Sequence, residues 1–430
     1  MAKQSTSFSK SSFRGHNAGA GRPPRASGVP PGFGVVKRSA LGTDAKYRNT
    51  ARKVDPETGE ILGIVEPLAG RLQRFILQSV TRKIIPMSRT NNCLRVRQGG
   101  KQIQVHKSIQ YGTTSYTGLQ TCGSVWICPV CAAKIAERRR AEIIAAMAAH
   151  EAAGGCMNML TLTSPHQLGD DLRELLAMQS TALHSFWNDR HVKAVFLEMG
   201  TVGQIRALEV THGRKSPRNN GWHPHYHVLL FNGLEPHLMR FQSLRDDQMT
   251  EWTLKLYERW AAACVKAGLG EPSLQHGLKL DDGSKAAKYV SKWGLEDEMT
   301  KGHTKKALHG ETPFDFLRAV LEDPDDKQAA ALFRHFSEVF KGKRQLHWSR
   351  GLKKLYSIGE KSDDELAEEK EDDFAVFLGT ITMEQWRDVL AVEGRGPLLL
   401  IAARSGWPAV LVYLAEIQGQ GKVAQLDNIT

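Results

Sequence analysis

The sequence feature that most constrains the fold is a run of nine residues in which histidines alternate with other side chains. His223, His225 and His227 stand at every second position, and four apolar residues follow. In a β-strand, residues two apart point to the same face, so His225 and His227 can aim both imidazoles at one ion while Tyr226 packs behind them. Packing alone does not explain three alternating histidines. We therefore expect a strand over residues 223–231 that carries a metal site.

A carboxylate on the preceding strand candidate is expected to complete this site. Glu209 stands in the middle of an otherwise apolar alternation over residues 205–211, where burial without a partner would be costly. Metal ligation removes that cost; the alternative is an outward-facing glutamate on a half-exposed strand. A mixed set of histidine and carboxylate ligands suits Mg²⁺ or Mn²⁺, which polarise a phosphodiester oxygen. His223 lies roughly 13 Å from His227 along an extended strand, so we expect it to support the ligands or to contact DNA.

A second chemical signal lies on a helix predicted over residues 284–295. Tyr289 and Lys292 are three residues apart and face the same way, which places a phenol beside an ammonium group. The cation lowers the pKa of the phenol and stabilises charge on phosphoryl oxygens, and Lys285 and Lys288 would attract the DNA backbone. A Tyr-x-x-Lys pair is common, so its weight comes from the histidine strand that precedes it.

Three cysteines crowd into ten residues, at Cys122, Cys128 and Cys131. In a reducing compartment such a cluster indicates a metal rather than disulfides. Thiolates at this spacing can form a tetrahedral zinc site, with Cys93 or His106 as the fourth ligand. The alternative is three reduced cysteines without a metal.

A long helix rich in alanine and arginine is predicted over residues 132–153, directly after the cysteines. Zinc would hold the loop that leads into this helix. Its basic residues Arg138, Arg139 and Arg140 are expected to lie on DNA phosphates.

Taken in order, these motifs resemble those of a known family. The alternating segment 160–163, the His-Pro-His-x-His strand and the Lys-Tyr-Val-x-Lys segment 288–292 are similar to the three motifs of the rolling-circle plasmid replication initiators (Rep proteins) of the Gram-positive type. These initiators fall within the HUH endonuclease superfamily, and the likeness covers about residues 122–293. A cysteine segment of this kind also precedes the catalytic motifs in such initiators.

The resemblance implies an α+β fold: a central antiparallel sheet flanked by helices, preceded by a cysteine-rich zinc segment and followed by a mostly helical C-terminal region. It also implies that His225 and His227 bind the metal, commonly with a carboxylate placed like Glu209. Tyr289 would nick the origin, remain joined to the 5′ phosphate and free a 3′-hydroxyl primer, and the protein would rejoin DNA at termination. Some relatives carry a glutamate where Lys285 stands here, which leaves the termination chemistry open.

The order of composition along the chain predicts six segments. They are a disordered basic arm over 1–67, a cysteine-containing zinc and DNA-binding segment over 68–155, a catalytic core over 156–300, a helical and basic extension over 301–362, an acidic linker over 363–373 and a small helical domain over 374–430.

Charge points to nucleic acid as the partner. The 58 basic and 46 acidic residues leave a net charge of +12, which favours polyanions. We expect origin DNA to bind as a double-stranded hairpin at the nick site and as single strands, with a host helicase and polymerase as further partners. The apolar run 397–403 is too short to span a bilayer, so we expect a cytoplasmic bacterial protein encoded on a plasmid, with no membrane partner.

Two other interpretations compete with a replication initiator. A conjugative relaxase or a single-strand transposase shares the histidine pair and the tyrosine chemistry, but relaxases usually place the tyrosine ahead of the histidines and these transposases are usually much shorter. A zinc-dependent DNA-binding regulator without catalysis would instead bind DNA without nicking it.

Overall fold

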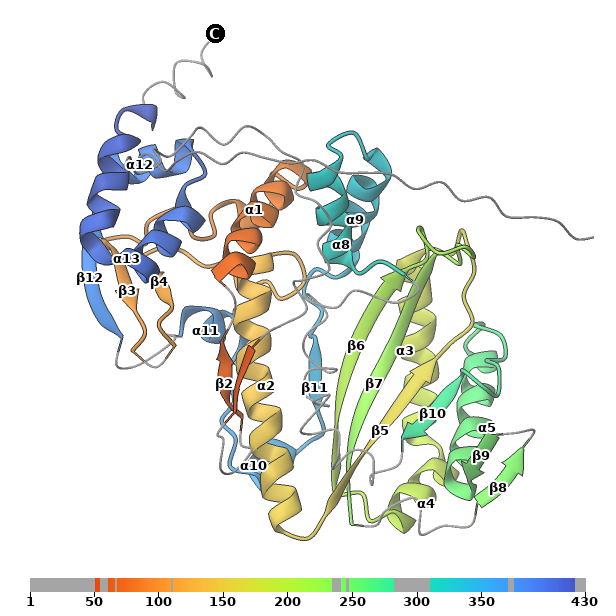
Figure 1. Ribbon diagram of the computed structural model, residues 1–430. Coiled ribbons are helices and arrows are strands. Elements are labelled where there is room, and N and C mark those ends of the chain that lie inside the picture. The colour runs from red at the N-terminus through yellow and green to blue at the C-terminus, as the bar shows by residue number, and fades with distance from the viewer. Residues whose placement is uncertain are drawn as a thin grey trace, which may run out of the picture. The chain divides into compact units, whose positions relative to one another are not determined.

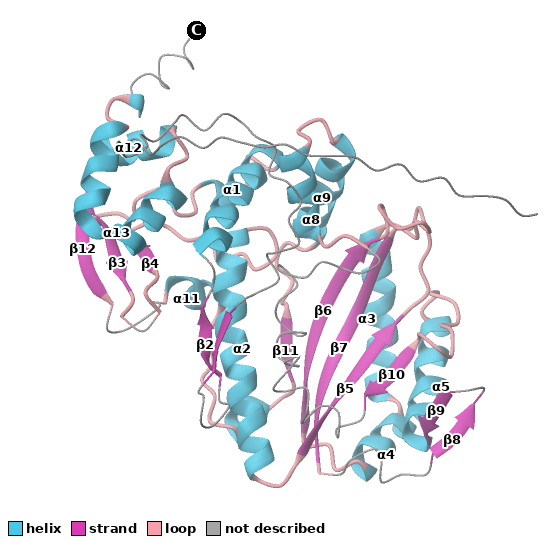
Figure 2. Ribbon diagram, in the orientation of Figure 1, coloured by secondary structure: helices cyan, strands magenta, loops and turns pink. Residues whose placement is uncertain are grey.

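The computed structural model describes residues 51–54, 61–65, 68–109, 111–233, 241–244, 247–281, 310–369 and 375–421. Within these ranges, helices pack against antiparallel sheets (Figures 1 and 2), so the predicted α+β class is confirmed.

A five-stranded antiparallel sheet forms the centre of the predicted catalytic core. Its strands follow the order β10-β5-β7-β6-β11, so the histidine strand β7 is the middle strand. The strand bounds are β5 Cys156–Thr163, β6 Gly203–His212, β7 Trp222–Asn232, β10 Leu278–Asp281 and β11 Leu346–Trp348. The edge strand β11 lies in residues 301–362, which were predicted as a separate extension. It pairs with β6 and is therefore part of the central sheet.

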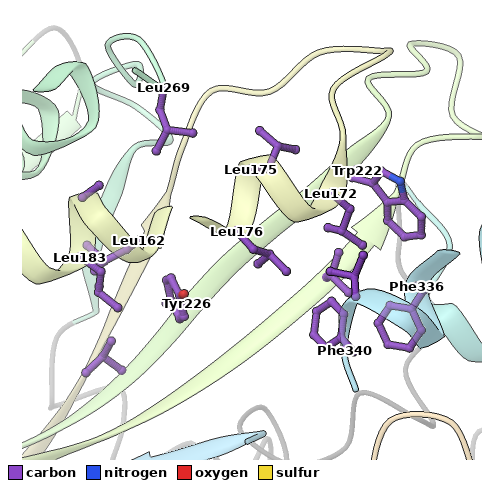
Figure 3. Packing of buried hydrophobic residues seen from close by; sticks show 14 of the residues in the cluster. Leu162, Leu172, Leu175, Leu176, Leu183, Trp222, Tyr226, Leu269, Phe336 and Phe340 are labelled. Carbon is purple, nitrogen blue, oxygen red and sulfur yellow. The ribbon is translucent and has the colours of Figure 1, made fainter. Parts of the chain in front are cut away.

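One face of this sheet is largely apolar and is covered by helices. These are α3 (Leu172–Asn188), α4 (Arg190–Glu198) and α5 (Glu251–Lys266). Figure 3 shows Leu162 and Tyr226 from the sheet facing Leu176 and Leu183 of α3. Helix α3 begins where the carboxylate of Asp171 accepts hydrogen bonds from the backbone N–H groups of the first turn.

The opposite face is covered over only part of its length. Helix α2 (Pro129–Ala152) packs there, with Met147 buried against Ala207 and Leu229 in one apolar cluster. Successive residues of a strand point to opposite faces, so the next same-face residues beyond this cluster are Glu209 and His227. Glu209 and His227 therefore lie on the same face as α2, next to the apolar residues that this helix covers.

A smaller antiparallel sheet joins the two ends of the described chain. Its order is β12-β3-β4, with β12 Val376–Ile381, β3 Ile103–Lys107 and β4 Thr114–Thr117. Helices α1 (Leu68–Ile84), α12 (Met383–Ala391) and α13 (Arg395–Glu416) contribute to the same core, in which Phe75 packs with Leu398. The predicted C-terminal helical segment thus includes a strand and shares its core with residues 75–119.

The remaining elements show where local expectations and structure differ. Helix α5 begins at Glu251, directly after the strands β8 and β9. The acidic run expected as a linker begins with α11, because Ser362 and Glu365 form a capping box. Two strands also lie within the arm expected to be disordered. The bounds are β1 Ala51–Val54, β2 Ile61–Val65, β8 Phe241–Leu244, β9 Asp247–Thr250, η2 Arg89–Asn91, α8 Pro313–Glu322, α9 Lys327–Val339, α10 Leu352–Leu355 and α11 Asp363–Glu368.

Helix α13 is, in the part of the chain that the structure describes, long and apolar enough to cross a membrane by length and composition alone. Its side chains Leu398, Ala402 and Val410 are fully buried in the core shared with α1. Gly406 interrupts the helix with a φ of +75°, and Pro408 follows two residues later. One side of α13 therefore packs in the core, while Leu411 and Val412 are exposed.

Candidate metal centres

Two neighbouring strands bring three potential metal ligands together. Glu209 on β6 lies directly opposite His225 on β7. Its Oε2 is 3.6 Å from Nε2 of His225 and 3.3 Å from Nε2 of His227. Ligand atoms about 2.1 Å from one ion and at right angles to each other lie about 3 Å apart. The expected trio therefore has the spacing that one cation needs, with small adjustments of the side chains.

The trio is partly exposed to solvent. The three side chains are between 11% and 15% exposed, so they are sheltered yet reachable from solvent. Three protein ligands leave further positions of a metal open. Such a site can bind a divalent cation and an oxygen atom of a substrate at the same time.

Strand β5 supplies a supporting residue that sequence reasoning missed. Thr161 lies opposite His227 in the sheet, and its Oγ1 is 3.3 Å from Nδ1 of that histidine. A hydrogen bond from Nδ1–H to this hydroxyl leaves Nε2, the atom near Glu209, with a free lone pair for a metal. The alternation of residues 160–163 predicted the strand, but only the register between strands reveals the contact.

A lysine on the next strand shares this face as well. Lys279 on β10 lies opposite Thr161, which lies opposite His227, and directly opposed residues share a face of the sheet. The Lys279 side chain is 68% exposed and its Nζ is 2.5 Å from the carboxylate of Asp281. It adds a cation two strands away from the histidines.

His223 lies outside the ligand trio. Its ring stacks on that of His166, with centroids 4.5 Å apart and an interplanar angle of 14°, and lies 4.9 Å from the ring of His225. Burial first, and then the neighbouring histidines, lower the pKa of His223 to about 3. A neutral His223 therefore packs beside the ligands, and its role in DNA contact stays a prediction.

The four cysteines form a second cluster. Cys93, Cys122, Cys128 and Cys131 are all buried and place their Sγ atoms within 4.8 Å of one another. The closest pairs are 3.5 Å, 3.7 Å and 3.8 Å apart. Tetrahedral zinc with Zn–S bonds of 2.3 Å separates its sulfurs by about 3.8 Å, so the spacing fits such an ion.

The sequence left Cys93 and His106 as alternatives for the fourth ligand, and the structure distinguishes them. Cys93 is in the cluster, whereas His106 lies on β3 with its ring against Phe377 and its Nε2 3.2 Å from the Gln104 side chain. Cys93 follows the 3-10 turn η2, which returns the chain from α1 to the other cysteines. Cys93 is therefore the fourth sulfur.

The electrostatics of the cluster favour a cation. Burial, and then hydrogen bonds with the other thiols, hold the pKa of Cys128 well above its usual value. Hydrogen bonds from the other three thiols lower the pKa of Cys122. Four buried thiolates would require a metal to offset their repulsion.

The arginines expected on DNA phosphates are paired within the protein. Arg138 bonds to Glu369, Arg139 to Glu142 and Asp363, and Arg140 to Glu137. Arg140 is also only 4% exposed. Each guanidinium has a carboxylate partner: Glu369 and Asp363 come from α11 and the residue after it, which pack against α2, and Glu137 and Glu142 lie on α2 itself. These pairs leave the three arginines poorly available to phosphates.

Four residues of the predicted tyrosine helix lie outside the described residues. They are Lys285, Lys288, Tyr289 and Lys292. Their roles stay predictions.

The sheet with paired histidines on its middle strand, together with the cysteine cluster, is consistent with the α+β fold expected for the HUH initiators. Residues 117–253 match the family described as Replication protein. This stretch contains the whole histidine and glutamate trio and three of the four clustered cysteines. The resemblance to the rolling-circle replication initiators predicted from the sequence is confirmed.

Two curated proteins are similar to the chain. Protein rep of Streptomyces lividans is 27% identical over 316 residues, which cover 59% of this chain and 68% of that protein. The Neomycin resistance protein of Streptomyces cyanogenus is 27% identical over 180 residues, which cover 35% of this chain and 39% of that protein. No solved structure matches the chain. The first similarity supports plasmid replication initiation as the general function.

Proposed function

We propose that this protein starts rolling-circle replication of a plasmid by nicking one strand of the double-strand origin and later rejoining the DNA. The observation that carries the proposal is the trio of Glu209, His225 and His227 on the partly uncovered face of the five-stranded sheet. Support comes from the match of the surrounding residues to the replication protein family.

The trio is suited to hold Mg²⁺ or Mn²⁺. When bound there, the ion would polarise a non-bridging oxygen of the scissile phosphodiester. Glu209 supplies the negative charge of the ligand set, and each histidine would bind through an unprotonated nitrogen; the Thr161 contact at Nδ1 of His227 would orient its ring so that Nε2 faces the ion. This arrangement would orient one phosphate against the sheet.

Tyr289 is the proposed nucleophile. Its phenolate would attack the phosphorus, so that a bond from Tyr289 Oη to phosphorus forms and the bond from phosphorus to the 3′ oxygen breaks. The leaving oxygen takes a proton and becomes the 3′-hydroxyl primer, while the 5′ phosphate stays on the tyrosine. Strand β10 ends at Asp281, and the eight residues up to Tyr289 can span up to about 29 Å, which brings the tyrosine within reach of the trio.

Basic residues would hold and steer the DNA. Lys285, Lys288 and Lys292 stand in the sequence around Tyr289, and Lys279 adds a cation on the face of the trio. Lysine contacts with phosphates position a strand without reading its sequence.

The cysteine cluster is proposed to bind structural zinc.

A cleavage assay tests the nicking reaction. Supercoiled plasmid carrying its own origin is incubated with the full chain and Mg²⁺ or Mn²⁺, and a denaturing gel detects the covalent protein–DNA adduct. The wild type and Tyr257→Phe, a tyrosine on α5 whose hydroxyl bonds to the carbonyl of Pro272, should form the adduct. Tyr289→Phe should bind the origin without forming it.

A matched pair of histidine variants tests the metal site in the same assay. His225→Ala should lose metal-dependent nicking, whereas His184→Ala, on the exposed face of α3, should keep it. Origin binding by the wild type without a nick in any metal would contradict the proposal and favour a non-catalytic regulator. An adduct with Tyr289→Phe would assign the chemistry to another tyrosine.

A further inference from the structure

A fully buried arginine lies close to the cysteine cluster. Arg395, the first residue of α13, has 0% exposure of its side chain. Its Nη1 donates to Oε1 of Gln78 at 2.7 Å and lies 3.4 Å from the carbonyl oxygen of Cys93 and 3.3 Å from that of Leu94. A buried charge is costly unless it is paired and hydrogen-bonded, so this placement needs a compensating interaction.

Gln78 connects the arginine to a sulfur atom. This residue of α1 is also fully buried. While its oxygen accepts from Arg395, its Nε2 donates to Sγ of Cys128 at 3.2 Å. Two of the four clustered cysteines are thus contacted, Cys128 at its sulfur through Gln78 and Cys93 at its backbone carbonyl.

The local carboxylate compensates the arginine only in part. Nη2 of Arg395 lies 3.4 Å from Glu393, but this carboxylate is 45% exposed and is shared with Arg82 and Arg95. One carboxylate therefore faces three guanidinium groups. A guanidinium keeps its charge at neutral pH, so Arg395 has less than one full carboxylate opposite it.

A metal-loaded cysteine cluster would supply the missing negative charge. Four thiolates around one divalent ion carry a net charge of about −2. A cation two hydrogen bonds away stabilises that charge, and an amide N–H on a thiolate keeps its lone pair aimed at the metal. Both partners are buried, where low dielectric strengthens these interactions.

We propose that Arg395 and Gln78 are positioning residues of the cysteine metal site, and that they hold a thiophilic divalent ion such as zinc by stabilising the thiolates of the loaded cluster. This inference rests on the proposed structural zinc site and is independent of the nicking reaction. It gives the C-terminal segment a specific task, since the loop and helix start at residues 393–395 become part of the support of a metal bound by residues 93–131.

Metal affinity of the full-length protein tests the proposal. Zinc affinity is measured by competition with a chromophoric chelator, and Co²⁺ is used as a probe because its visible bands report the thiolate set. The variants are Arg395→Met and Gln78→Met, and the matched control is Arg404→Met, an exposed arginine on the same helix. Circular dichroism checks that each variant is folded.

Arg395→Met and Gln78→Met should bind zinc about 10- to 100-fold more weakly than the wild type, as supporting residues of metal sites do, and Arg404→Met should bind like the wild type. Folded Gln78→Met with wild-type zinc affinity would overturn the proposal, and this variant decides the matter if Arg395→Met does not fold. A wild type that binds neither zinc nor Co²⁺ would overturn the metal site itself, whatever the result of the nicking assay.

Discussion

Replacing Thr161 with valine removes the hydroxyl that contacts His227 of the histidine and glutamate trio and leaves the volume of the side chain almost unchanged. The hydroxyl lies 3.3 Å from Nδ1 of His227, which is long for a hydrogen bond. One such bond contributes about 0.5–1.5 kcal/mol, or about 2- to 13-fold in affinity, while supporting residues of metal sites contribute about 10- to 100-fold. The two ranges overlap near tenfold, so we expect an approximately tenfold weaker Mn²⁺ affinity, or about 1.4 kcal/mol.

Calorimetric titration of the full chain with Mn²⁺ measures this effect. The matched control is Thr163→Val, which makes the same change two residues along β5, opposite His225. Thr163→Val should bind Mn²⁺ like the wild type. A Thr161→Val affinity within twofold of the wild type, with the fold intact, would refute the argument that this hydroxyl orients His227.

Three further predictions concern the cysteine cluster, a buried ion pair and the DNA. Cys122→Ser should lose bound zinc and melt at a lower temperature, and a wild-type zinc content by atomic absorption would contradict the site. Burial raises the pKa of Glu311, but hydrogen bonds from Arg214 outweigh the effect of burial, and the pKa falls below the usual 4.5. Because the folded-state pKa is lowered, the ionised Glu311 stabilises the fold at neutral pH. This stabilisation is lost as the pH falls below about 4.5. Arg214→Met should therefore cost about 3–5 kcal/mol at pH 7 and flatten the acid dependence of the melting temperature, and an unchanged profile would refute this assignment. Origin affinity should fall steeply with salt concentration if phosphate contacts dominate, whereas a flat dependence in a filter-binding titration would exclude that mode.

The sequence predicted best those elements whose own pattern carries the information. Strand β6 and the histidine half of β7 alternate with a period of two, and strands β5, β6 and β7 lie where the sequence pattern predicts them. The trio of Glu209, His225 and His227 could be predicted from the sequence because its ligands lie on consecutive strands, β6 and β7, joined by a hairpin. Parity along each strand fixes the face to which a side chain points.

What the sequence could not predict depends on contacts between distant segments. Cys93 precedes the next clustered cysteine by 29 residues, and only the return of the chain after α1 places it with the others. Thr161 needed the register of β5 against β7. Strand β12 pairs with β3 across some 270 residues, so residues 374–430 looked independent only because no local pattern encodes that partner.

The arginines of α2 show that the partners of charged residues also depend on contacts between distant segments. Arg138, Arg139 and Arg140 form a basic run in the sequence, which favours polyanions as partners. Two of their carboxylate partners, Glu369 of Arg138 and Asp363 of Arg139, are more than 200 residues away along the chain. Charge along a sequence therefore predicts attraction to DNA only where folding leaves the charge unpaired.

The edge strand β11 has a consequence for how the chain is made. Ile205 of β6 pairs with Trp348 of β11, and these residues are 348 − 205 = 143 positions apart. Synthesis at about 5–20 residues per second leaves the edge of β6 without this partner for about 7–29 seconds on each ribosome. An uncovered edge is a template for pairing with another chain, so fragments that stop before residue 348 should aggregate, and expression should improve when translation of residues 206–348 is fast.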